Sequence, residues 1–301
     1  MADQDVKVTA IRPDQIRLTV RDGYGRIARG QGGCCGAGAA SPSSCCGSPA
    51  PEQLVAALGY QDADLAALPA GANLGLSCGH PTALAALRPG EVVLDLGCGG
   101  GFDCFVAGPR VGPAGRVIGV DMTPDMLTRA RGLLPEFTAR TGLANVEFRL
   151  GEIEHLPVAD QSVDVVISNC VLNLSPDQAQ VWREIFRVLR PGGRLAIADL
   201  ALRRPLPPAI RQSVAALIGC VAGAAPIDEI RAWMTAAGFD EVRFAEKPQA
   251  IEAMLASHDP LYQEIMAALP AGASLADYVT SLAIAAIKPG ACEVAPGGRA
   301  T

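Results

Sequence analysis

Ten cysteines in a chain of 301 residues are the side chains of this sequence with the most distinctive chemistry. A chain of this length can build its own core, and cysteines at this density are too sparse for a disulfide scaffold. In a reducing compartment, such cysteines are typically buried hydrophobes, metal ligands or redox groups. They are Cys34, Cys35, Cys45, Cys46, Cys78, Cys98, Cys104, Cys170, Cys220 and Cys292.

Three isolated cysteines lie where the fold could bring them to a ligand cleft. Cys170 directly follows an expected strand in SNCVLNLSPD, so we expect it above the carboxyl edge of a sheet. Cys78, in NLGLSCGHP, precedes the first helix of the expected core, and Cys220, in LIGCVAGAAP, follows the fifth expected strand. A thiol is a soft ligand and favours a soft substrate. Ordinary packing is the alternative for each cysteine, and spacing alone does not bring the three together.

Two vicinal pairs, Cys34-Cys35 and Cys45-Cys46, lie in a Gly/Ala/Ser/Pro stretch over 30–50 that predicts a flexible loop. Adjacent Cα atoms are about 3.8 Å apart, below the usual disulfide range of about 4.4–6.8 Å, so each pair would close only with strain. A flexible loop instead allows one thiol to reach another elsewhere, and the spacing does not fit the usual zinc motifs. The remaining cysteines are expected to pack in the core or to lie in the tail: Cys98 and Cys104, and Cys292.

A glycine-rich turn, VVLDLGCGGGFD, joins an expected strand to a helix and predicts a cofactor site. Gly97, Gly99 and Gly101 remove side chains where the backbone turns and a ligand approaches closely. A nicotinamide-dinucleotide fingerprint would place a glycine where Phe102 stands. Asp95 would repel a pyrophosphate, whereas its carboxylate suits an ammonium group.

Polar side chains follow the other expected strands at the same edge of the sheet. Asp121 ends the second strand and can accept hydrogen bonds from both hydroxyls of a ribose, while Glu152-Ile153 can flank an adenine. S-adenosylmethionine carries a ribose, an adenine and an ammonium group but no phosphate, so it fits better than a dinucleotide. Packing is the alternative for Met122 and Ile153. The predicted cofactor-binding residues are Asp95, Gly97, Gly99, Gly101, Asp121, Met122, Glu152, Ile153 and Asn169.

Alternating strands and helices must position these residues. Short, strongly apolar runs alternate with helical stretches, which predicts a doubly wound, mostly parallel α/β sheet. The expected strands are 91–96, 116–121, 146–150, 163–169 and 194–200, with possible strands at 240–247 and 278–287. Helices are expected at 13–29 (with Ile16, Val20, Tyr24 and Ile27 on one face), 51–58, 62–68, 81–88, 205–219 and 227–237.

Local signals predict where two of the core helices begin and end. Thr123-Pro124 and Ser175-Pro176 each indicate an N-cap followed by proline at the first helical position, and Gly192-Gly193 indicates the end of the second helix. Glu154 and His155, near the same expected edge, are interpreted as solvated loop residues. Asp199 is interpreted as a polar residue that ends its strand and has no further role.

Composition excludes several classes of protein. Half of the residues are hydrophobic and 19% are charged, which rules out wholesale disorder, and a net charge of -6 argues against nucleic-acid binding. The longest apolar run, 214–225, falls short of the roughly 20 residues of a membrane span. The first residues carry no apolar signal segment, so a cytoplasmic location without a membrane partner is expected. We divide the chain into helices and the cysteine loop (1–80), a cofactor-binding core (81–201), a substrate-side region (202–288) and a tail (289–301).

Together these motifs resemble the arsenite methyltransferases, S-adenosylmethionine-dependent enzymes of arsenic detoxification. The resemblance covers the Cys-Cys loop, ANLGLSCGHPTALAALRPGEVVLDLGCGGGFD, VIGVDMTPDML, NVEFRLGEIEHLPV, ISNCVLNLSPD, FRVLRPGGRLAIAD and GCVAGA. It implies a Rossmann-like class I methyltransferase fold with an N-terminal helical segment and a C-terminal α+β extension. Two residues depart from the family pattern: His80 replaces the usual Asn, beside Cys78, whose ionisation it could alter, and Cys98 stands where Ser is frequent.

The resemblance also implies roles for individual cysteines. Cys78, Cys170 and Cys220 would hold trivalent arsenic, and Cys45 or Cys46 would take part in a thiol–disulfide relay. Arsenite or its thiol conjugates would be the substrate, with thioredoxin or glutathione as the external reductant. Two alternatives remain open: a methyltransferase acting on a small organic acceptor such as a quinone, and a non-catalytic metalloid-binding or thiol-redox protein on a methyltransferase core.

Overall fold

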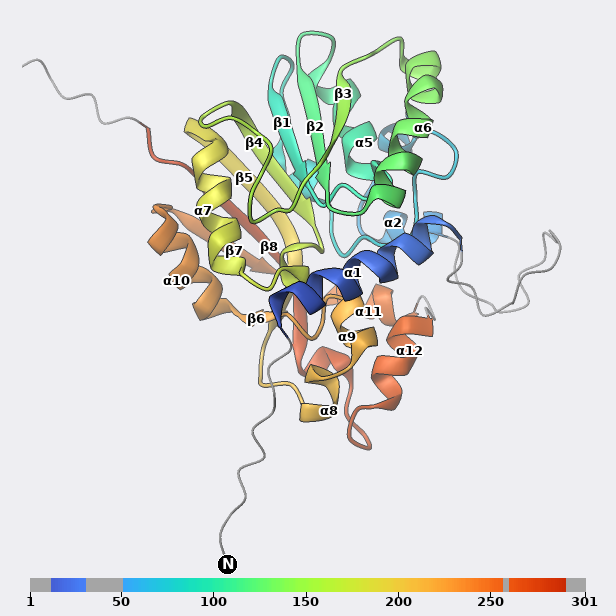
Figure 1. Ribbon diagram of the computed structural model, residues 1–301, viewed down its shortest axis with the longest axis vertical. Helices are drawn as coiled ribbons and strands as arrows, with labels where there is room; N and C mark the ends of the chain where they lie inside the picture. The colour runs from blue at the N-terminus through green and yellow to red at the C-terminus, as the bar shows by residue number, and fades with distance from the viewer. Residues whose placement is uncertain (1–11, 31–50, 257–259, 291–301) are drawn as a thin grey trace, which may run out of the picture.

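The structure is a computed structural model that describes residues 12–30, 51–256 and 260–290. Within this part of the chain, one sheet has the strand order β3-β2-β1-β4-β5-β8-β7, with the short β6 paired to β5 (Figure 1). The strands from β3 to β5 are parallel, and β8 runs antiparallel between β5 and β7. The predicted doubly wound, mostly parallel sheet is therefore confirmed. The strands are β1 (Val92–Leu96), β2 (Arg116–Asp121), β3 (Val146–Leu150), β4 (Val163–Asn169), β5 (Leu189–Leu202), β6 (Ala225–Pro226), β7 (Val242–Glu246) and β8 (Val279–Ile287).

Helices cover both faces of the sheet because alternate strand residues point to opposite sides. In β1, Leu94 joins a cluster with Trp182 of α7, whereas Val93 joins a second cluster with Phe105 of α5 and Phe137 of α6. Figure 1 shows α7 and α10 on one side of the sheet and α5 and α6 on the other. The helices are α1 (Pro13–Ala28), α2 (Pro51–Ala57), α3 (Asp62–Leu65), α4 (Pro81–Ala85), α5 (Phe102–Val111), α6 (Pro124–Thr141), α7 (Gln178–Val188), α8 (Pro208–Arg211), α9 (Val214–Ile218), α10 (Ile227–Ala237), α11 (Pro248–Ala256) and α12 (Pro260–Ala267), with short 3-10 turns η1 (Leu172–Leu174) and η2 (Leu275–Asp277).

Two predicted helix boundaries around α7 are wrong. Pro124 is indeed the first residue of α6, but α7 begins at Gln178, because the Asp177 side chain accepts a hydrogen bond from the Gln180 backbone at 3.0 Å and provides the cap. The helix also ends at Val188, before the two glycines, which lie inside β5. Gly192 there has a φ of +78°, so it bends the strand rather than ending the helix.

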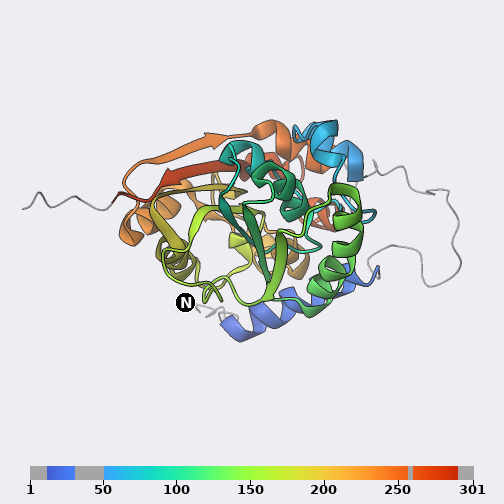
Figure 2. The same cartoon turned by 90° about the horizontal axis from the view of Figure 1, so that it is seen from above.

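The region after β5 completes the sheet and builds a layer below it. The expected helix over 205–219 is divided into α8 and α9, since the Ser213 side chain caps a new helix by accepting from the Ala216 backbone at 3.2 Å. Figure 1 shows α8, α9, α11 and α12 gathered under α1, and Figure 2 shows α1 lying along α6. Helices α11 and α12 were not predicted.

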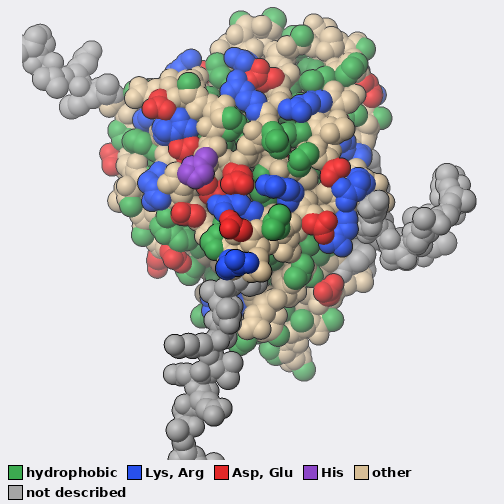
Figure 3. Space-filling model, in the orientation of Figure 1, with side chains coloured by type: hydrophobic (Ala, Val, Ile, Leu, Met, Phe, Trp, Pro, Cys, Tyr) green, Lys and Arg blue, Asp and Glu red, His purple; other side chains and the backbone are tan. Residues whose placement is uncertain are grey.

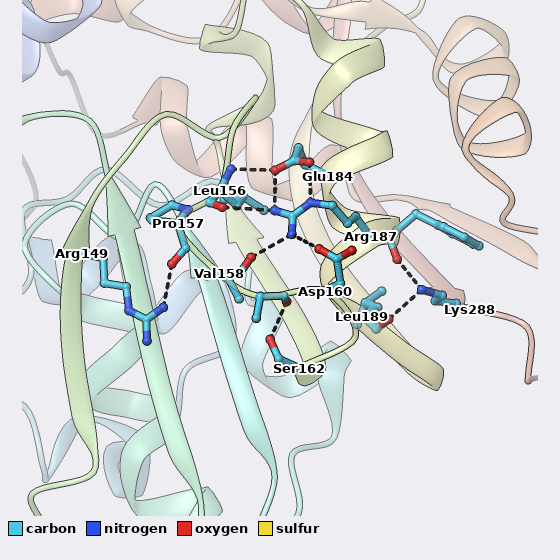
Figure 4. Close-up of polar contacts among 12 residues, drawn as sticks. Arg149, Leu156, Pro157, Val158, Asp160, Ser162, Glu184, Arg187, Leu189 and Lys288 are labelled. Atoms are coloured by element: carbon cyan, nitrogen blue, oxygen red, sulfur yellow. Dashed lines mark hydrogen bonds and ion pairs between the residues drawn. The ribbon is translucent and has the colours of Figure 1, made fainter.

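The loop between β3 and β4 is fastened to α7 by one arginine (Figure 4). Arg187 pairs with Glu184 at 2.7 Å and with Asp160 at 2.6 Å, and it donates to the carbonyl oxygens of Leu156 and Val158 at 3.1 and 2.8 Å. Glu184 in turn accepts from the Leu156 backbone at 2.7 Å. This network fastens the returning loop to the last turns of α7, beside the amino end of β4.

On the face drawn in Figure 3, basic and acidic side chains are interspersed rather than separated by sign. None of the helices in the described ranges is long and apolar enough to cross a membrane.

Candidate functional site

A cleft opens at the carboxyl ends of β1, β2 and β4, where ligands bind in open parallel sheets. Seven of the nine residues predicted to bind a cofactor line it, together with Cys170: Asp95, Gly97, Gly99, Asp121, Met122, Ile153 and Asn169. The polar edge expected from the sequence is thus one wall of a real cavity.

The glycine turn between β1 and α5 forms the floor of this cleft. Gly97 and Gly99 both have left-handed backbone, with φ of +63° and +50°. A side chain at Gly97 would overlap Val171, whereas at Gly99 the nearest neighbour of an added Cβ would be 3.9 Å away, which leaves room for a ligand. Gly101 does not line the cleft; a Cβ there would meet Phe148 at 2.7 Å, so its lack of a side chain serves packing.

Two buried carboxylates make one end of the cleft attractive to a cation. Asp95 is 2% exposed and accepts a hydrogen bond from the Cys104 thiol at 3.2 Å. Burial, and next the nearby charge of Asp103, raise the pKa of Asp95 well above its usual value. Burial also raises the pKa of Asp103 to about 6, although Tyr60 and Asn169 donate to its oxygens at 2.7 and 3.1 Å. An ammonium group placed here would stabilise both carboxylates in their charged form.

Asp121 stands at the end of β2 on the opposite side of the glycine turn. Its two oxygens accept hydrogen bonds from the backbone of Gly99 at 2.9 Å and of Thr123 at 2.7 Å, and burial raises its pKa. Each carboxylate oxygen has a further lone pair. The geometry therefore leaves Asp121 able to accept hydrogen bonds from the hydroxyls of a sugar.

The segment after β3 meets helix α1. Ile153 lines the cleft, but Glu152 does not: its carboxylate pairs with Arg17 at 3.3 Å and with Arg21 at 3.5 Å. A contact between Glu152 and a cofactor stays a prediction.

Glu154 was expected to be a solvated loop residue, and this is wrong. It is 3% exposed, lines the cleft, and accepts hydrogen bonds from Ser175 at 2.7 Å and from Arg17 at 3.2 Å. The reason is that α1 covers it from a distant part of the chain. His155, by contrast, is exposed as expected.

Three cysteines from distant segments meet beside the cleft. Cys78 and Cys170 form a disulfide with a Cα–Cα distance of 5.9 Å, across a sequence separation of 92 residues. The free thiol of Cys220 donates to the carbonyl oxygen of Cys170 at 2.8 Å. All three belong to one buried apolar cluster, and Cys170 also lines the cleft. Their predicted role toward arsenic remains a prediction.

Cys170 and Cys220 share an unusual backbone conformation. Their φ angles are +56° and +61°, and in the described ranges Ala86 and Gln161 are the other non-glycine residues with positive φ. Such a conformation costs of order 1–3 kcal/mol and tends to persist at functional sites. The surrounding fold therefore holds these two cysteines in place at some cost in stability.

Asn169 connects the cysteines to the cation-attracting end of the cleft. Its side-chain oxygen accepts from the Cys78 backbone at 3.0 Å, while its amide nitrogen donates to Asp103. His80, beside Cys78 in sequence, faces elsewhere: its ring stacks on Tyr60 with centroids 3.7 Å apart, and burial lowers its pKa.

Residues of α1 are a part of the site that the sequence did not predict. Arg17, Val20 and Tyr24 line the cleft. The Tyr24 hydroxyl donates to the carbonyl oxygen of Ile218 at 3.1 Å and lies 3.9 Å from the sulfur of Cys220. Val20 and Tyr24 stand on the apolar face of the predicted helix, a signal that by itself indicates only packing.

Some predicted positions cannot be placed. The vicinal pairs Cys34-Cys35 and Cys45-Cys46, and the tail residue Cys292, lie outside the described residues. In the described ranges the free cysteines are Cys98, Cys104 and Cys220, and no group of three or more His, Cys, Asp or Glu side chains is arranged to hold a metal ion.

Comparison with known proteins agrees with this geometry. A methyltransferase-domain family matches residues 87–240. The arsenite methyltransferase of Halobacterium salinarum is 44% identical over 290 residues, which cover 95% of this chain and 70% of that protein. The arsenite methyltransferase of Aquipseudomonas alcaligenes is 43% identical over 164 residues, 54% of this chain and 47% of that protein. An arsenic(III) S-adenosylmethionine methyltransferase from Chlamydomonas reinhardtii superimposes with a TM-score of 0.56 at 30% identity, covering 79% of this chain and 74% of that one.

Proposed function

The chain belongs to the arsenite methyltransferase family, and from this premise we propose that Cys78, Cys170 and Cys220 hold the arsenic that it methylates. Its reaction is the transfer of a methyl group from S-adenosylmethionine to trivalent arsenic. The observation that carries the proposal is the position of Cys170. It is bonded to Cys78, hydrogen-bonded by Cys220, and exposed to the cofactor cleft.

The cleft fits the parts of S-adenosylmethionine. Asp95 and Asp103 suit its ammonium group, Asp121 suits its ribose hydroxyls, and Ile153 offers an apolar surface for its adenine. When bound, this molecule supplies a methyl group activated by a sulfonium sulfur. Asn169, between the carboxylates and Cys78, positions the cysteine segment against the same end of the cleft.

Three thiols suit arsenite because each can replace one oxygen. Three arsenic–sulfur bonds form, three arsenic–oxygen bonds break, and each thiol proton leaves with an oxygen as water. The arsenic keeps its lone pair, which takes the methyl group while S-adenosylhomocysteine leaves. The nucleophile loses no proton, so no general base is needed, and the protein contributes mainly by orientation, an effect that can supply about 7–11 kcal/mol.

The disulfide between Cys78 and Cys170 must open before three thiols are available. A thiol reductant of the thioredoxin or glutathione class would supply two electrons and two protons and would itself become a disulfide. Cys45 or Cys46 would pass this exchange on to Cys78 and Cys170. We propose a cytoplasmic location because the reaction depends on such a reducing pool.

Single serine variants of the three cysteines test the proposal. A serine hydroxyl is harder and far less acidic than a thiol, so Cys78→Ser, Cys170→Ser and Cys220→Ser should each lower arsenite methylation about 100-fold or more, as a misplaced reacting atom does. The assay mixes arsenite, a thiol and S-adenosylmethionine and measures methylated arsenic. Cys292→Ser is the matched control and should keep the parent rate.

The same assay separates the alternatives. S-adenosylmethionine binding, measured by calorimetry, should survive in all four variants. Parent-level methylation in the three site variants would disprove the thiol assignment. S-adenosylhomocysteine formed only with an organic acceptor would indicate a different methyltransferase, and arsenite binding without any S-adenosylhomocysteine would indicate a non-catalytic protein.

A further inference from the structure

Two more thiols face each other in the floor of the cofactor cleft, and the proposed reaction uses neither. Cys98 lies in the glycine turn and Cys104 in the first turn of α5; both are free and buried. A Cβ added to Gly119 of β2 would lie 2.8 Å from the sulfur of Cys98 and 2.9 Å from that of Cys104. Both sulfurs therefore stand over the same strand atom, in the space that the missing side chain leaves.

This pair is accessible from the cleft through Cys98. Cys98 is 7% exposed and lines the cleft, whereas Cys104 lies behind it and donates to the Asp95 carboxylate. The charges of both Asp95 and Asp121 act on the Cys98 thiol, and burial, the largest effect, raises its pKa to about 11. Cys98 lies near the two carboxylates that suit the ammonium and the ribose of the cofactor, since the adjacent Gly99 donates to Asp121 at 2.9 Å and the neighbouring Cys104 donates to Asp95 at 3.2 Å.

We propose that Cys98 and Cys104 form a second arsenical site, a dithiol that binds trivalent arsenic compounds with two exchangeable oxygens and thereby blocks S-adenosylmethionine. Two neighbouring thiols provide two soft ligands, which match an arsenic atom that already carries one carbon group. This site is separate from the three-cysteine cluster, so the proposal can be tested independently of the proposed catalytic role of that cluster.

The binding step balances without an external oxidant or base. Two arsenic–sulfur bonds form and two arsenic–oxygen bonds break, so that each thiol proton leaves with an oxygen as a water molecule. Asp95, which already accepts the Cys104 hydrogen bond, can receive that proton first and pass it on. Arsenic stays trivalent, and no electrons are transferred.

Occupation of the dithiol would inhibit the enzyme. The bound arsenical would take the Cys104 hydrogen from Asp95 and place its carbon group in the cleft beside Asp121. A monomethylated trivalent arsenical has the required two exchangeable oxygens, and it forms when one methyl transfer is followed by a two-electron reduction of the arsenic by the thiol reductant, which becomes a disulfide. The site would therefore make methylation self-limiting when product accumulates.

Phenylarsine oxide, a trivalent arsenical with one carbon group, is the probe. We would measure S-adenosylmethionine affinity by calorimetry, with and without the probe, in a full-length variant in which Cys78, Cys170 and Cys220 are serine. The probe should raise the apparent dissociation constant about tenfold or more. Adding Cys98→Ser or Cys104→Ser to this background should abolish the effect; Cys104→Ser keeps a hydroxyl to donate to Asp95. The cysteines outside the described residues are the same in all three proteins, so their reaction with the probe cancels.

An equal effect of the probe in all three proteins, or no effect in the first, would refute the proposal. If the background variant does not bind S-adenosylmethionine, intact mass spectrometry on the parent chain and on Cys98→Ser alone decides the question. The parent should retain one more phenylarsenic group per chain than Cys98→Ser. Equal numbers of bound groups would refute the second site.

Discussion

Asp103 gives the cofactor site a pH dependence that can be measured without arsenic. Its carboxylate is buried, and burial raises its pKa from 3.8 to about 6. A bound ammonium group favours the ionised carboxylate, so binding should release the proton that Asp103 holds at low pH. Affinity for S-adenosylmethionine should therefore rise as the pH rises through the pKa of the empty site.

The size of this effect follows from the difference between the pKa of Asp103 without and with a bound ammonium group. If the ammonium group returns the pKa of Asp103 from about 6 to its ordinary 3.8, the linkage relation gives a rise in affinity of about tenfold between about pH 5 and pH 7. Higher pH is avoided because α-amino groups lose their own proton near about 7.7–8.0. The sign is opposite for stability: an acid with a raised pKa favours the folded state below its unfolded pKa, and this contribution is lost as the pH rises through about 6.

Isothermal calorimetry of S-adenosylmethionine binding at several pH values would test this reasoning. In Asp103→Asn the part of the rise near the pKa of Asp103 should disappear, and affinity near neutral pH should fall about 100-fold, because the neutral side chain binds the ammonium group only as well as the protonated acid does. Asp228→Asn, which changes an exposed acid on α10, should keep the parent profile. A parent profile that is flat between these pH values, or one that Asp103→Asn leaves intact, would refute a cation site at this carboxylate.

Two further substitutions test how the cleft is built. Gly97→Ala places a side chain on a left-handed residue and makes it overlap Val171, so urea denaturation should show that the free energy of unfolding falls by about 2–4 kcal/mol. The control is Gly142→Ala, whose φ is +71° but whose added Cβ meets nothing, and it should lower the free energy of unfolding by only about 1–2 kcal/mol. Equal losses in the two variants would contradict the role of packing at Gly97. Tyr24→Phe leaves the Ile218 carbonyl without its donor and should lower the free energy of unfolding by about 1 kcal/mol; an unchanged denaturation curve would show that this hydrogen bond does not fasten α1.

The carboxyl edge of the sheet was predictable because its signals are local. Each apolar run is followed within a residue or two by its polar end, so Asp95 and Asp121 could be assigned to one edge before any contact was known. The start of α7 was less predictable because two neighbouring residues can each cap a helix. Ser175-Pro176 fits a helix start, but Asp177 is an equally good cap two residues later, and Ser175 bonds to Glu154 instead.

The rest of the site depends on contacts between distant parts of the chain. Glu154 is buried because Arg17, 137 residues away, covers it, and no spacing rule indicates that pairing. Spacing could not indicate that Cys78 and Cys170 meet, since 92 residues separate them, and only the family resemblance implied it. The juxtaposition of Cys98 and Cys104 depends on the missing side chain of a neighbouring strand, a feature that becomes visible only once the register of β1 and β2 is known.

The most direct test of the three-thiol site is the number of sulfur atoms bound to arsenic. X-ray absorption spectroscopy would be applied to the reduced chain carrying Cys98→Ser, loaded with one equivalent of arsenite. We predict three sulfur neighbours for the arsenic in this protein, and two sulfurs with one oxygen when Cys220→Ser is added. The same sulfur coordination with and without Cys220 would contradict the account.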